Sequence, residues 1–222
     1  MDKLFPRITP ELKACCPDLA LGVIRCDIKN EPHNEALWKV IETEIETLRR
    51  SYTLETLKNQ PEIAATRQAY KNTGKDPSRY RPSAEALCRR ILRDMELYRI
   101  STAVDVINLI SIRTGFSIGG FDYDCVKGNL TAGIGAADEL FEAIGRGWLN
   151  IEGLPTLRDE YGAIGTPTSD TPRTSIQLHT KRLLMNINAY RGEKSLFPVM
   201  DDVISLLKTY LCAEQIETKI IV

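Results

Sequence analysis

The chain has 222 residues, 43% of them hydrophobic and 27% charged, which is ordinary globular composition. At this length a chain can bury most of its apolar surface without disulfides or metals. Its 29 lysines and arginines nearly balance 30 acidic residues, and the net charge is −1. The whole molecule therefore has no attraction for nucleic acid or an anionic membrane, and any RNA contact must come from a local patch.

Targeting and redox signals are weak in this sequence. The N-terminal residues 1–7 lack the apolar run of a signal peptide, and no later stretch is long and apolar enough to cross a bilayer. We therefore expect a soluble, cytoplasmic protein. With only His33 and His179 and no C-x-x-C pair, we predict reduced structural thiols, no metal site and no cofactor. The cysteines are Cys15, Cys16, Cys26, Cys88, Cys125 and Cys212.

The first hundred residues predict a strand followed by helices. Residues 19–28 partly alternate apolar and polar side chains, which favours a strand. Asn34 can cap the next helix, in which apolar residues from Leu37 to Leu48 recur at helical spacing. Pro61 is expected to open another helix that ends near Gly74.

A proline-rich loop separates these helices from the two that follow. Residues 75–82 carry two prolines and cannot form a helix interior. Pro82 suits the first position of a helix whose apolar stripe runs to Met95. Residues 102–113 are apolar nearly all round if helical, which predicts burial on more than one side.

The centre of the sequence predicts several short strands. Between residues 116 and 176 glycines, prolines and β-type runs alternate, and neither glycine cluster fits a phosphate-binding loop. A strand over 182–190, a helix over 198–211 and a closing strand over 218–222 follow. This order predicts one α+β domain over residues 1–222, with mixed sheets in a sandwich-like centre flanked by helices.

Basic residues gather between residues 67 and 99, where nine lysines and arginines face four acidic residues. Arginine side chains of this segment can bind phosphates, while Tyr70 and Tyr80 can offer stacking surfaces. Spacing alone favours a simpler account, in which Glu85, Arg89, Arg93 and Glu96 form ordinary ion pairs on a solvated helix face. For Arg79 and Arg81, prolines stiffen the loop and favour binding, although pairing with a carboxylate is equally compatible.

The buried helix carries a polar seam of Asp105, Asn108 and Ser111. Unsatisfied polar groups in a core cost roughly 1–3 kcal/mol each, so these side chains either bond to the protein or line a wet pocket. Thr102 and Asp105 have the spacing of a capping box, which explains Asp105 structurally. Asn108 lacks such a partner and is the better pocket residue.

Other groups carry weaker signals. The hydroxyl-rich segment 166–174 has no adjacent histidine and no G-x-S-x-G elbow, so a serine hydrolase is not predicted. His179 is expected to be structural. The pairs Asp122/Asp124 and Asp138/Glu139 have the spacing of exposed turns, which disfavours a carboxylate-pair enzyme.

Taken together, several short motifs in order resemble the signature of the B3/4 domain family, the tRNA-editing domain found in the β subunit of bacterial phenylalanyl-tRNA synthetase. They span roughly residues 70–190. The matching segments are Arg79-Tyr80-Arg81-Pro82-Ser83-Ala84-Glu85-Ala86-Leu87-Cys88-Arg89-Arg90, Val104-Asp105-Val106-Ile107-Asn108-Leu109-Ile110-Ser111, Phe121-Asp122-Tyr123-Asp124, Arg173-Thr174 and Thr180.

The resemblance implies a compact α+β fold with a pocket between sheet and helices. In the synthetase this domain binds the acceptor end of mischarged tRNA and hydrolyses the tyrosyl ester. The present chain keeps the pocket asparagine as Asn108. It has Ile107 where the family has threonine and Gly119 where it has histidine, and segment 165–170 contains no glutamate.

Two functional hypotheses follow from the resemblance. The first is a stand-alone module that recognises tRNA or aminoacyl-tRNA at its acceptor end, or a related aminoacyl ester, with or without hydrolysis. The second is a non-catalytic binder of RNA or of a small aromatic or amino-acid ligand in the same pocket. Aminoacylation by this chain alone is not expected. The catalytic residues are unknown, and the predicted binding residues are Arg79, Arg81, Asn108, Asp122, Thr174 and Thr180.

Overall fold

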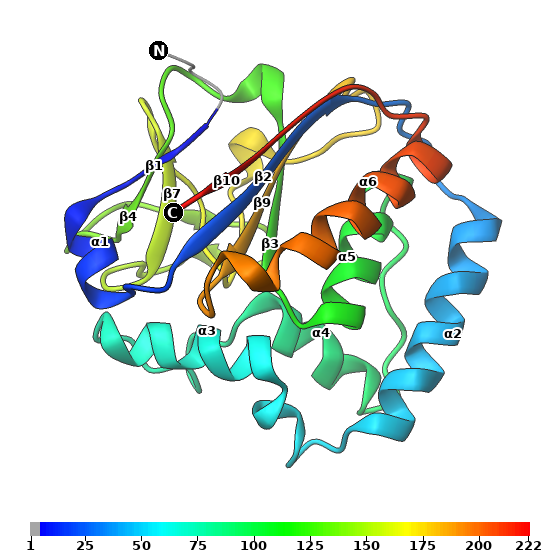
Figure 1. Ribbon diagram of the computed structural model, residues 1–222, viewed down its shortest axis with the longest axis horizontal. Coiled ribbons are helices and arrows are strands. Elements are labelled where there is room, and N and C mark those ends of the chain that lie inside the picture. Colours follow the sequence, from blue (N-terminus) through cyan, green and yellow to red (C-terminus); the bar gives the residue numbers. More distant parts are fainter. Residues whose placement is uncertain (1–4) are drawn as a thin grey trace.

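Two four-stranded sheets pack face to face, and helices cover the outer side of one of them, as the computed structural model of residues 5–222 shows (Figure 1). The sheet beside the helices has the strand order β10-β2-β9-β3 and is antiparallel throughout. We call it sheet B. Its strands are β2 (Ala20–Asp27), β3 (Ile118–Asp122), β9 (Arg182–Ala189) and β10 (Glu214–Ile221).

The second sheet, sheet A, has the strand order β1-β4-β7-β8. It is mixed, because β1 pairs with β4 in parallel, whereas β4 with β7 and β7 with β8 are antiparallel. A small hairpin of β5 and β6 follows β4 in the chain. The strands are β1 (Arg7–Ile8), β4 (Thr131–Ile134), β5 (Glu142–Ala143), β6 (Gly147–Trp148), β7 (Pro155–Asp159) and β8 (Gly162–Gly165).

Side chains alternate between the two faces of sheet B, and in β2 and β9 both faces are buried. Leu21 and Val23 of β2 and Leu184 of β9 point toward sheet A and pack in one apolar cluster with its strands. The intervening residues, such as Ile24 and Met185, point to the other side and pack against helices. Burial on both faces explains why β2 and β9 are almost continuously apolar.

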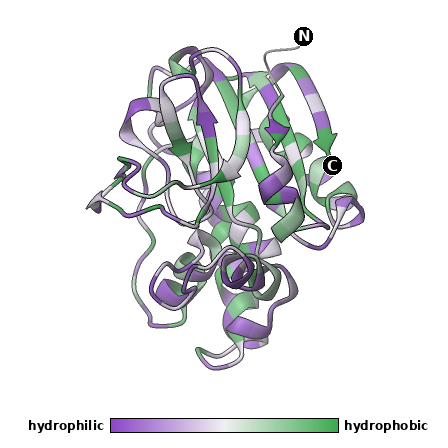
Figure 2. Cartoon of the chain, turned by 90° about the vertical axis from the view of Figure 1, so that its left-hand side faces the viewer, coloured by the Kyte–Doolittle hydropathy of each residue, from purple (hydrophilic) through white to green (hydrophobic). Residues whose placement is uncertain are grey.

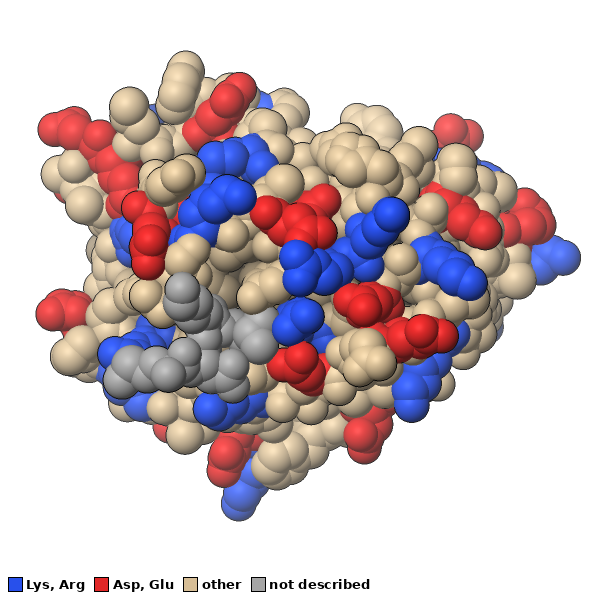
Figure 3. Space-filling model, turned by 90° about the horizontal axis from the view of Figure 1, so that it is seen from above, with Lys and Arg blue, Asp and Glu red and all other residues tan. Residues whose placement is uncertain are grey.

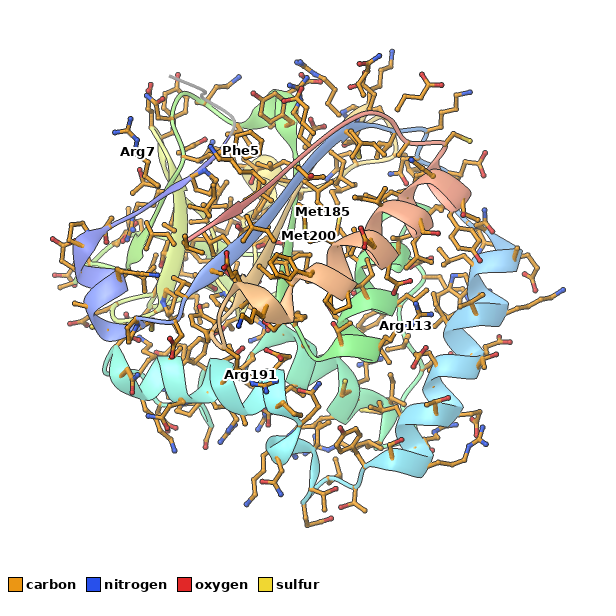
Figure 4. All side chains as sticks on the ribbon, in the orientation of Figure 1. Phe5, Arg7, Arg113, Met185, Arg191 and Met200 are labelled. Carbon is orange, nitrogen blue, oxygen red and sulfur yellow. The ribbon has the colours of Figure 1, made fainter. Side chains whose placement is uncertain are left out.

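Three helices form the layer on sheet B: α2 (Glu35–Ser51), α5 (Thr102–Thr114) and α6 (Phe197–Leu211). Helix α5 contacts both of the others as well as β3. Near its end Arg113 donates to Glu44 of α2 at 3.0 Å and to Asp202 of α6 at 2.7 Å. Figure 4 shows Arg113 at this meeting point. One side chain thus ties the three helices together.

The remaining helices are α1 (Pro10–Cys15), α3 (Pro61–Asn72) and α4 (Ser83–Ile91). Helix α3 lies across the lower ends of the sheets in Figure 1. There Arg191, which follows β9, donates to Glu62 of α3 at 2.7 Å (Figure 4). Single 3₁₀ turns occur at Leu57–Asn59, Tyr123–Cys125, Pro172–Thr174 and Glu193–Ser195.

Most predicted elements are confirmed. The strand over 19–28 is β2, the helix capped by Asn34 is α2, and the side chain of Asn34 accepts from Leu37 N at 3.0 Å. The helix after Pro61 ends at Asn72, two residues before Gly74. The buried helix, the short central strands, and the strand and helix after residue 180 are present as α5, β3 to β8, β9 and α6.

Three local predictions are wrong, and two short elements were not predicted. Helix α4 begins after Pro82 and stops at Ile91, because the chain turns and Asp94 takes a left-handed conformation (φ 56°), which leaves Met95 46% exposed. The capping box does not form, since Ser101 and not Thr102 stands at the N-cap position of α5, and the Ser101 side chain makes no capping hydrogen bond there. Asp105 instead accepts from the indole Nε1 of Trp38 at 2.7 Å. Strand β10 starts at Glu214, earlier than predicted, and β1 with α1 was not anticipated.

Polarity follows the layers of the fold. Figure 2 shows hydrophobic segments on the strands and mixed or hydrophilic colouring on the surface loops. Within residues 5–222 the helices are too short or too polar to span a bilayer.

Candidate functional site

Asn108, the predicted pocket residue, lies on the less buried stripe of α5 together with Val104. Its amide makes no hydrogen bond within the described part of the chain, and it is half-buried. The adjacent Ile107 packs over β3: a Cβ added to Gly120 would lie 2.4 Å from Ile107 Cδ1 and 2.9 Å from Ile176 Cδ1. Ile107, which stands where the family has threonine, therefore fills the space over this strand.

A carboxyl group, that of Asp170, bonds to the backbone at the outer edge of β3. Asp170 Oδ2 accepts a hydrogen bond from Gly120 N at 3.2 Å. Its other oxygen, Oδ1, would be 2.5 Å from a Cβ on Gly165 and 3.4 Å from one on Gly119. The glycine at 165 thus makes room for the carboxyl group. Burial raises the pKa of Asp170 to about 7, against one stabilising hydrogen bond from Gly120.

Asp170 also lines a small cavity between the two sheets. Alternation along β9 points Asn186 and Asn188 into this otherwise apolar layer, with Tyr190 after them. The amide of Asn186 donates to Asn188 Oδ1 at 3.0 Å, but Asn186 Oδ1 and Tyr190 OH have no partner among residues 5–222. The cavity measures about 20 Å³, which is enough for about one water molecule. It cannot hold an aminoacyl group.

Sequence reasoning missed Asp170 and Asn186. It looked for a glutamate in segment 165–170 and did not consider the shorter carboxylate at the end of that segment. The signal in the sequence was an aspartate between Ser169 and Thr171 beside Gly165, and two asparagines at same-face positions of a predicted strand. Gly119 does line this cavity, whereas Asn108 does not.

The second predicted group, Arg79 and Arg81, lies beside α4. Glu85 is fully buried, and three arginines converge on its carboxylate. Arg67 donates at 2.9 Å and Arg89 at 2.8 Å, while Arg81 Nε lies at 3.6 Å, beyond hydrogen-bond distance. We call these four residues the Glu85 cluster. The predicted ion pair of Glu85 with Arg89 forms, but the prediction that this helix face is solvated is wrong for Glu85, which is fully buried.

The Glu85 cluster has three positive charges and one negative charge, so it presents an excess of cationic donors. Arg67 is fixed further by bonds to Pro77 O at 3.2 Å and Ser78 Oγ at 3.3 Å. Arg81 Nε is buried and has no hydrogen-bond partner within the described chain. Arg79 is exposed and lies over the Tyr80 ring, with its guanidinium carbon 5.6 Å from the centroid.

Of the other predicted residues, Asp122 ends β3, Thr180 lies just before β9, and Thr174 lies in the 3₁₀ turn Pro172–Thr174. Asp122 and Thr180 are buried and bond to each other, with Thr180 Oγ1 donating to Asp122 Oδ2 at 2.7 Å. Thr174 is fully buried and its hydroxyl has no partner among the described residues. No recorded contact joins these three side chains to Asn108 or to the Glu85 cluster. The structure thus separates the six predicted residues into three groups.

An open groove of about 650 Å³ lies beside Thr180. It is bordered by the end of β2 and the start of β9, and we call it the β2–β9 groove. The residues around it are Asp27, Ile28, Lys29, Asn30, Asp124, Leu178, His179, Thr180, Lys181 and Arg182.

Buried thiols offer little nucleophilic chemistry. Burial raises the pKa of Cys16 to about 11 and of Cys88 to about 12, which keeps both neutral. Within residues 5–222 the cysteines are free of disulfides, and no three His, Cys, Asp or Glu side chains are grouped to hold a metal ion.

Comparison with known proteins places the chain in a family. The family model described as the B3/4 domain matches residues 65–195. The chain belongs to the B3/4 domain family. No curated protein matches it significantly. A solved structure with similarity is an N-terminal fragment of the phenylalanyl-tRNA synthetase beta-subunit from Pyrococcus horikoshii, with 13% identity and a TM-score of 0.43. The similarity covers 96% of this chain and 49% of that fragment, so the chain spans about half of its length.

Proposed function

We propose that this B3/4 protein recognises the acceptor end of aminoacyl-tRNA, or a related aminoacyl ester. The observation that carries the proposal is the Glu85 cluster. A fully buried carboxylate holds Arg67 and Arg89 in place, and the side chain of Arg81 beside it is 36% exposed. Guanidinium groups fixed in this way lose little conformational freedom when they bind phosphate oxygens. They also supply the local patch that a chain with a net charge of −1 requires.

The proposal gives Asn108 the polar contact to the aminoacyl end. Its half-buried amide has donor and acceptor atoms that the described chain does not use. Ile107, its neighbour in α5, lies with Ile176 over Gly120 of β3, so the surroundings of an ester there would be apolar. The family resemblance supports the same residue.

Binding without turnover is the second candidate function, and the small cavity favours it. The inter-sheet space of about 20 Å³ has room for about one water molecule, and the buried hydroxyl–carboxylate pair of Thr180 and Asp122 does not line it. Hydrolysis would then depend on a positioned water and on the 2′-hydroxyl of the RNA.

A deacylation assay tests both forms of the proposal. We would measure hydrolysis and binding over a panel of mischarged tRNAs with the wild-type protein, Asn108→Ala and Arg79→Ala. Recognition of aminoacyl-tRNA predicts that Asn108→Ala weakens binding of charged tRNA more than that of uncharged tRNA. Binding without turnover would reject the hydrolase form. Equal affinity for charged and uncharged tRNA in all three proteins would reject aminoacyl recognition.

A further inference from the structure

Strand β10 is the longest strand that lies at an edge of either sheet. It has eight residues, whereas the other edge strands, β1, β8 and β3, have two, four and five. Among residues 5–222 it pairs with β2 on one side and with no strand on the other. Figure 1 shows β10 in front of the other strands of sheet B, and Figure 2 shows it at one border of the molecule. Such an edge can pair with a strand of another chain.

The opposite edge of sheet B, formed by β3, is already covered. The carboxyl group of Asp170 accepts from Gly120 N, and Phe121 forms a β-bridge with Ser175. In the described chain the backbone of β10 has no bridge or hydrogen bond to any segment except β2. The two edges therefore differ, and β10 is the one that can accept a further strand.

The charged side chains of β10 make the strand complementary to itself. Glu217 and Lys219 are two residues apart and so lie on the same face of the sheet, on either side of Thr218. A two-fold axis perpendicular to the sheet at Thr218 would place β10 of a second copy antiparallel to the first. Every side chain keeps its face in this arrangement. Glu217 of each copy then lies opposite Lys219 of the other, which gives two pairs of opposite charge.

Neighbouring registers lack this match. An axis at Glu217 would place two carboxylates opposite each other, and an axis at Lys219 would do the same with two ammonium groups. Thr218 lies in the regular part of the strand, which pairs with β2 continuously over residues 217–221. The bulge before it, where Gln215 has a φ of 49°, lies outside this part. The charge pattern thus selects one register.

Both charged groups can reach a second copy. Glu217 Oε1 accepts from Arg25 Nη1 at 3.1 Å, but its side chain is still 45% exposed. Lys219 is exposed, and its ammonium group lies 5.3 Å from the centroid of the Phe5 ring, with no carboxylate partner in the described chain. Charges of one sign on an edge strand hinder pairing between copies. Here the opposite signs of Glu217 and Lys219 favour it.

The overall charge also permits two copies to approach. The net charge is −1, so long-range repulsion between copies is small. Figure 3 shows basic and acidic side chains interleaved on the face seen from above, without a large area of one sign. Local pairs such as Glu217 with Lys219 therefore decide how two copies would meet.

We propose that β10 is an interface between two copies of this chain. The two β10 strands pair antiparallel about an axis at Thr218, and they join the two copies of sheet B into one continuous antiparallel sheet. Glu217 and Lys219 form an ion pair with the second copy at each end of the contact. This interface does not include the Glu85 cluster, so the inference goes beyond the proposed function.

Charge reversal tests the pairing, with light scattering and sedimentation of the full chain as readouts. The wild type should be a dimer that dissociates on dilution. Glu217→Lys and Lys219→Glu, each alone, place like charges opposite each other and should dimerise at least about tenfold more weakly. An equimolar mixture of the two variants restores both opposite-charge pairs and should dimerise again. Lys208→Glu, which changes an exposed lysine of α6, should behave as the wild type.

The mixture is the decisive sample. Glu217→Lys also loses the bond to Arg25, but it does so alone and in the mixture, so the difference between these samples reports only the contact between copies. Circular dichroism of each variant establishes that it is folded. A wild type that stays monomeric at all concentrations would overturn the proposal. Equal association of the wild type and both variants, or a mixture no more associated than the separate variants, would overturn it too.

Cross-linking tests the register independently. The Thr218 residues of the two copies face each other, and opposite residues of antiparallel strands have Cα atoms roughly 4.5–5.5 Å apart, which suits a disulfide. In a Cys212→Ser background, which removes an exposed thiol, Thr218→Cys should form a covalent dimer on oxidation. Thr209→Cys, on the exposed side of α6, should not. A dimer in which Thr218→Cys cross-links no better than Thr209→Cys would contradict the β10 interface.

Discussion

The carboxyl group of Asp170 lies beside Gly165 and Gly119 and receives one hydrogen bond, from Gly120 N. Burial raises its pKa from 3.8 to about 7. A raised pKa means that the folded state binds this proton more tightly than the unfolded state. The contribution of protonated Asp170 to the unfolding free energy is therefore fully present below pH 3.8 and is lost as the pH rises through about 7.

Asp170→Asn removes this titration and keeps a similar shape. Between pH 5 and pH 8 the wild type should lose roughly 2–3 kcal/mol of unfolding free energy relative to the variant. Urea unfolding of both proteins across this range measures the difference. Parallel pH profiles for the two proteins would show that Asp170 does not titrate in this way.

At the level of single residues, the sequence identified polar groups more readily than their partners. It predicted that Asn108 lacks a local partner, and the structure agrees. It assigned Asp105 to a capping box, although Trp38, distant in the chain, is the actual partner. Contacts such as this depend on how α2 and α5 pack, and spacing along one helix does not contain that information.

At the level of elements, Gly133 and Gly135 show how one motif contains two different glycines. A Cβ on Gly135 would lie 1.9 Å from the backbone oxygen of Ile151. That oxygen cannot move away unless the backbone of Ile151 moves with it. A Cβ on Gly133 would lie 3.1 Å from Arg158 Nη1 and 3.2 Å from Thr9 Cγ2, which are both ends of side chains. The backbones at Gly135 and Gly153 are also joined by a hydrogen bond of 2.9 Å. Of the two glycines in this motif, Gly135 is therefore the one that close backbone approach requires.

We expect Gly135→Ala to lower the unfolding free energy by about 2 kcal/mol or more, since the clash is with backbone. The matched variant Gly133→Ala should change it by less than about 1 kcal/mol. Thermal unfolding of the two variants and the wild type provides the comparison. Equal destabilisation by both substitutions would contradict the assigned contact with Ile151.

Element type was predictable wherever periodicity was strong, as in α2, α5 and β9. Boundaries were harder, and α4 is the example. Its apolar rhythm continues to Met95, but Arg90 O accepts from both Arg93 N and Met95 N, and the chain turns there. Strand β1, with two residues, is too short to leave a pattern, and only its pairing with β4 defines it.

At the level of the whole molecule, the family match covers less than the folding unit. Residues 65–195 include β3 and β9 but not β2, which lies between β9 and β10 in sheet B. Helices α2 and α6 also lie outside the match, although both contribute to the main apolar cluster. Segments outside the family match therefore help to build the sheet and the helical layer that support α5.

The Glu85 cluster joins α3, the loop after it and α4 through one buried carboxylate. The overall fold therefore fixes the positions of its arginine side chains. Arg81 and Arg49 offer a matched pair for testing what this charge does. Their side chains are 36% and 39% exposed, and both lie near carboxylates. Only Arg81 belongs to the cluster, because Arg49 lies on α2 beside Glu46 and Asp94.

The most direct test is the affinity for an aminoacylated tRNA acceptor hairpin as a function of salt, for the wild type, Arg81→Glu and Arg49→Glu. Recognition through the cluster predicts that Arg81→Glu binds about tenfold more weakly and lowers the slope of log affinity against log salt by about one. Arg49→Glu should match the wild type. Identical affinities and slopes for all three proteins would contradict RNA recognition by the Glu85 cluster.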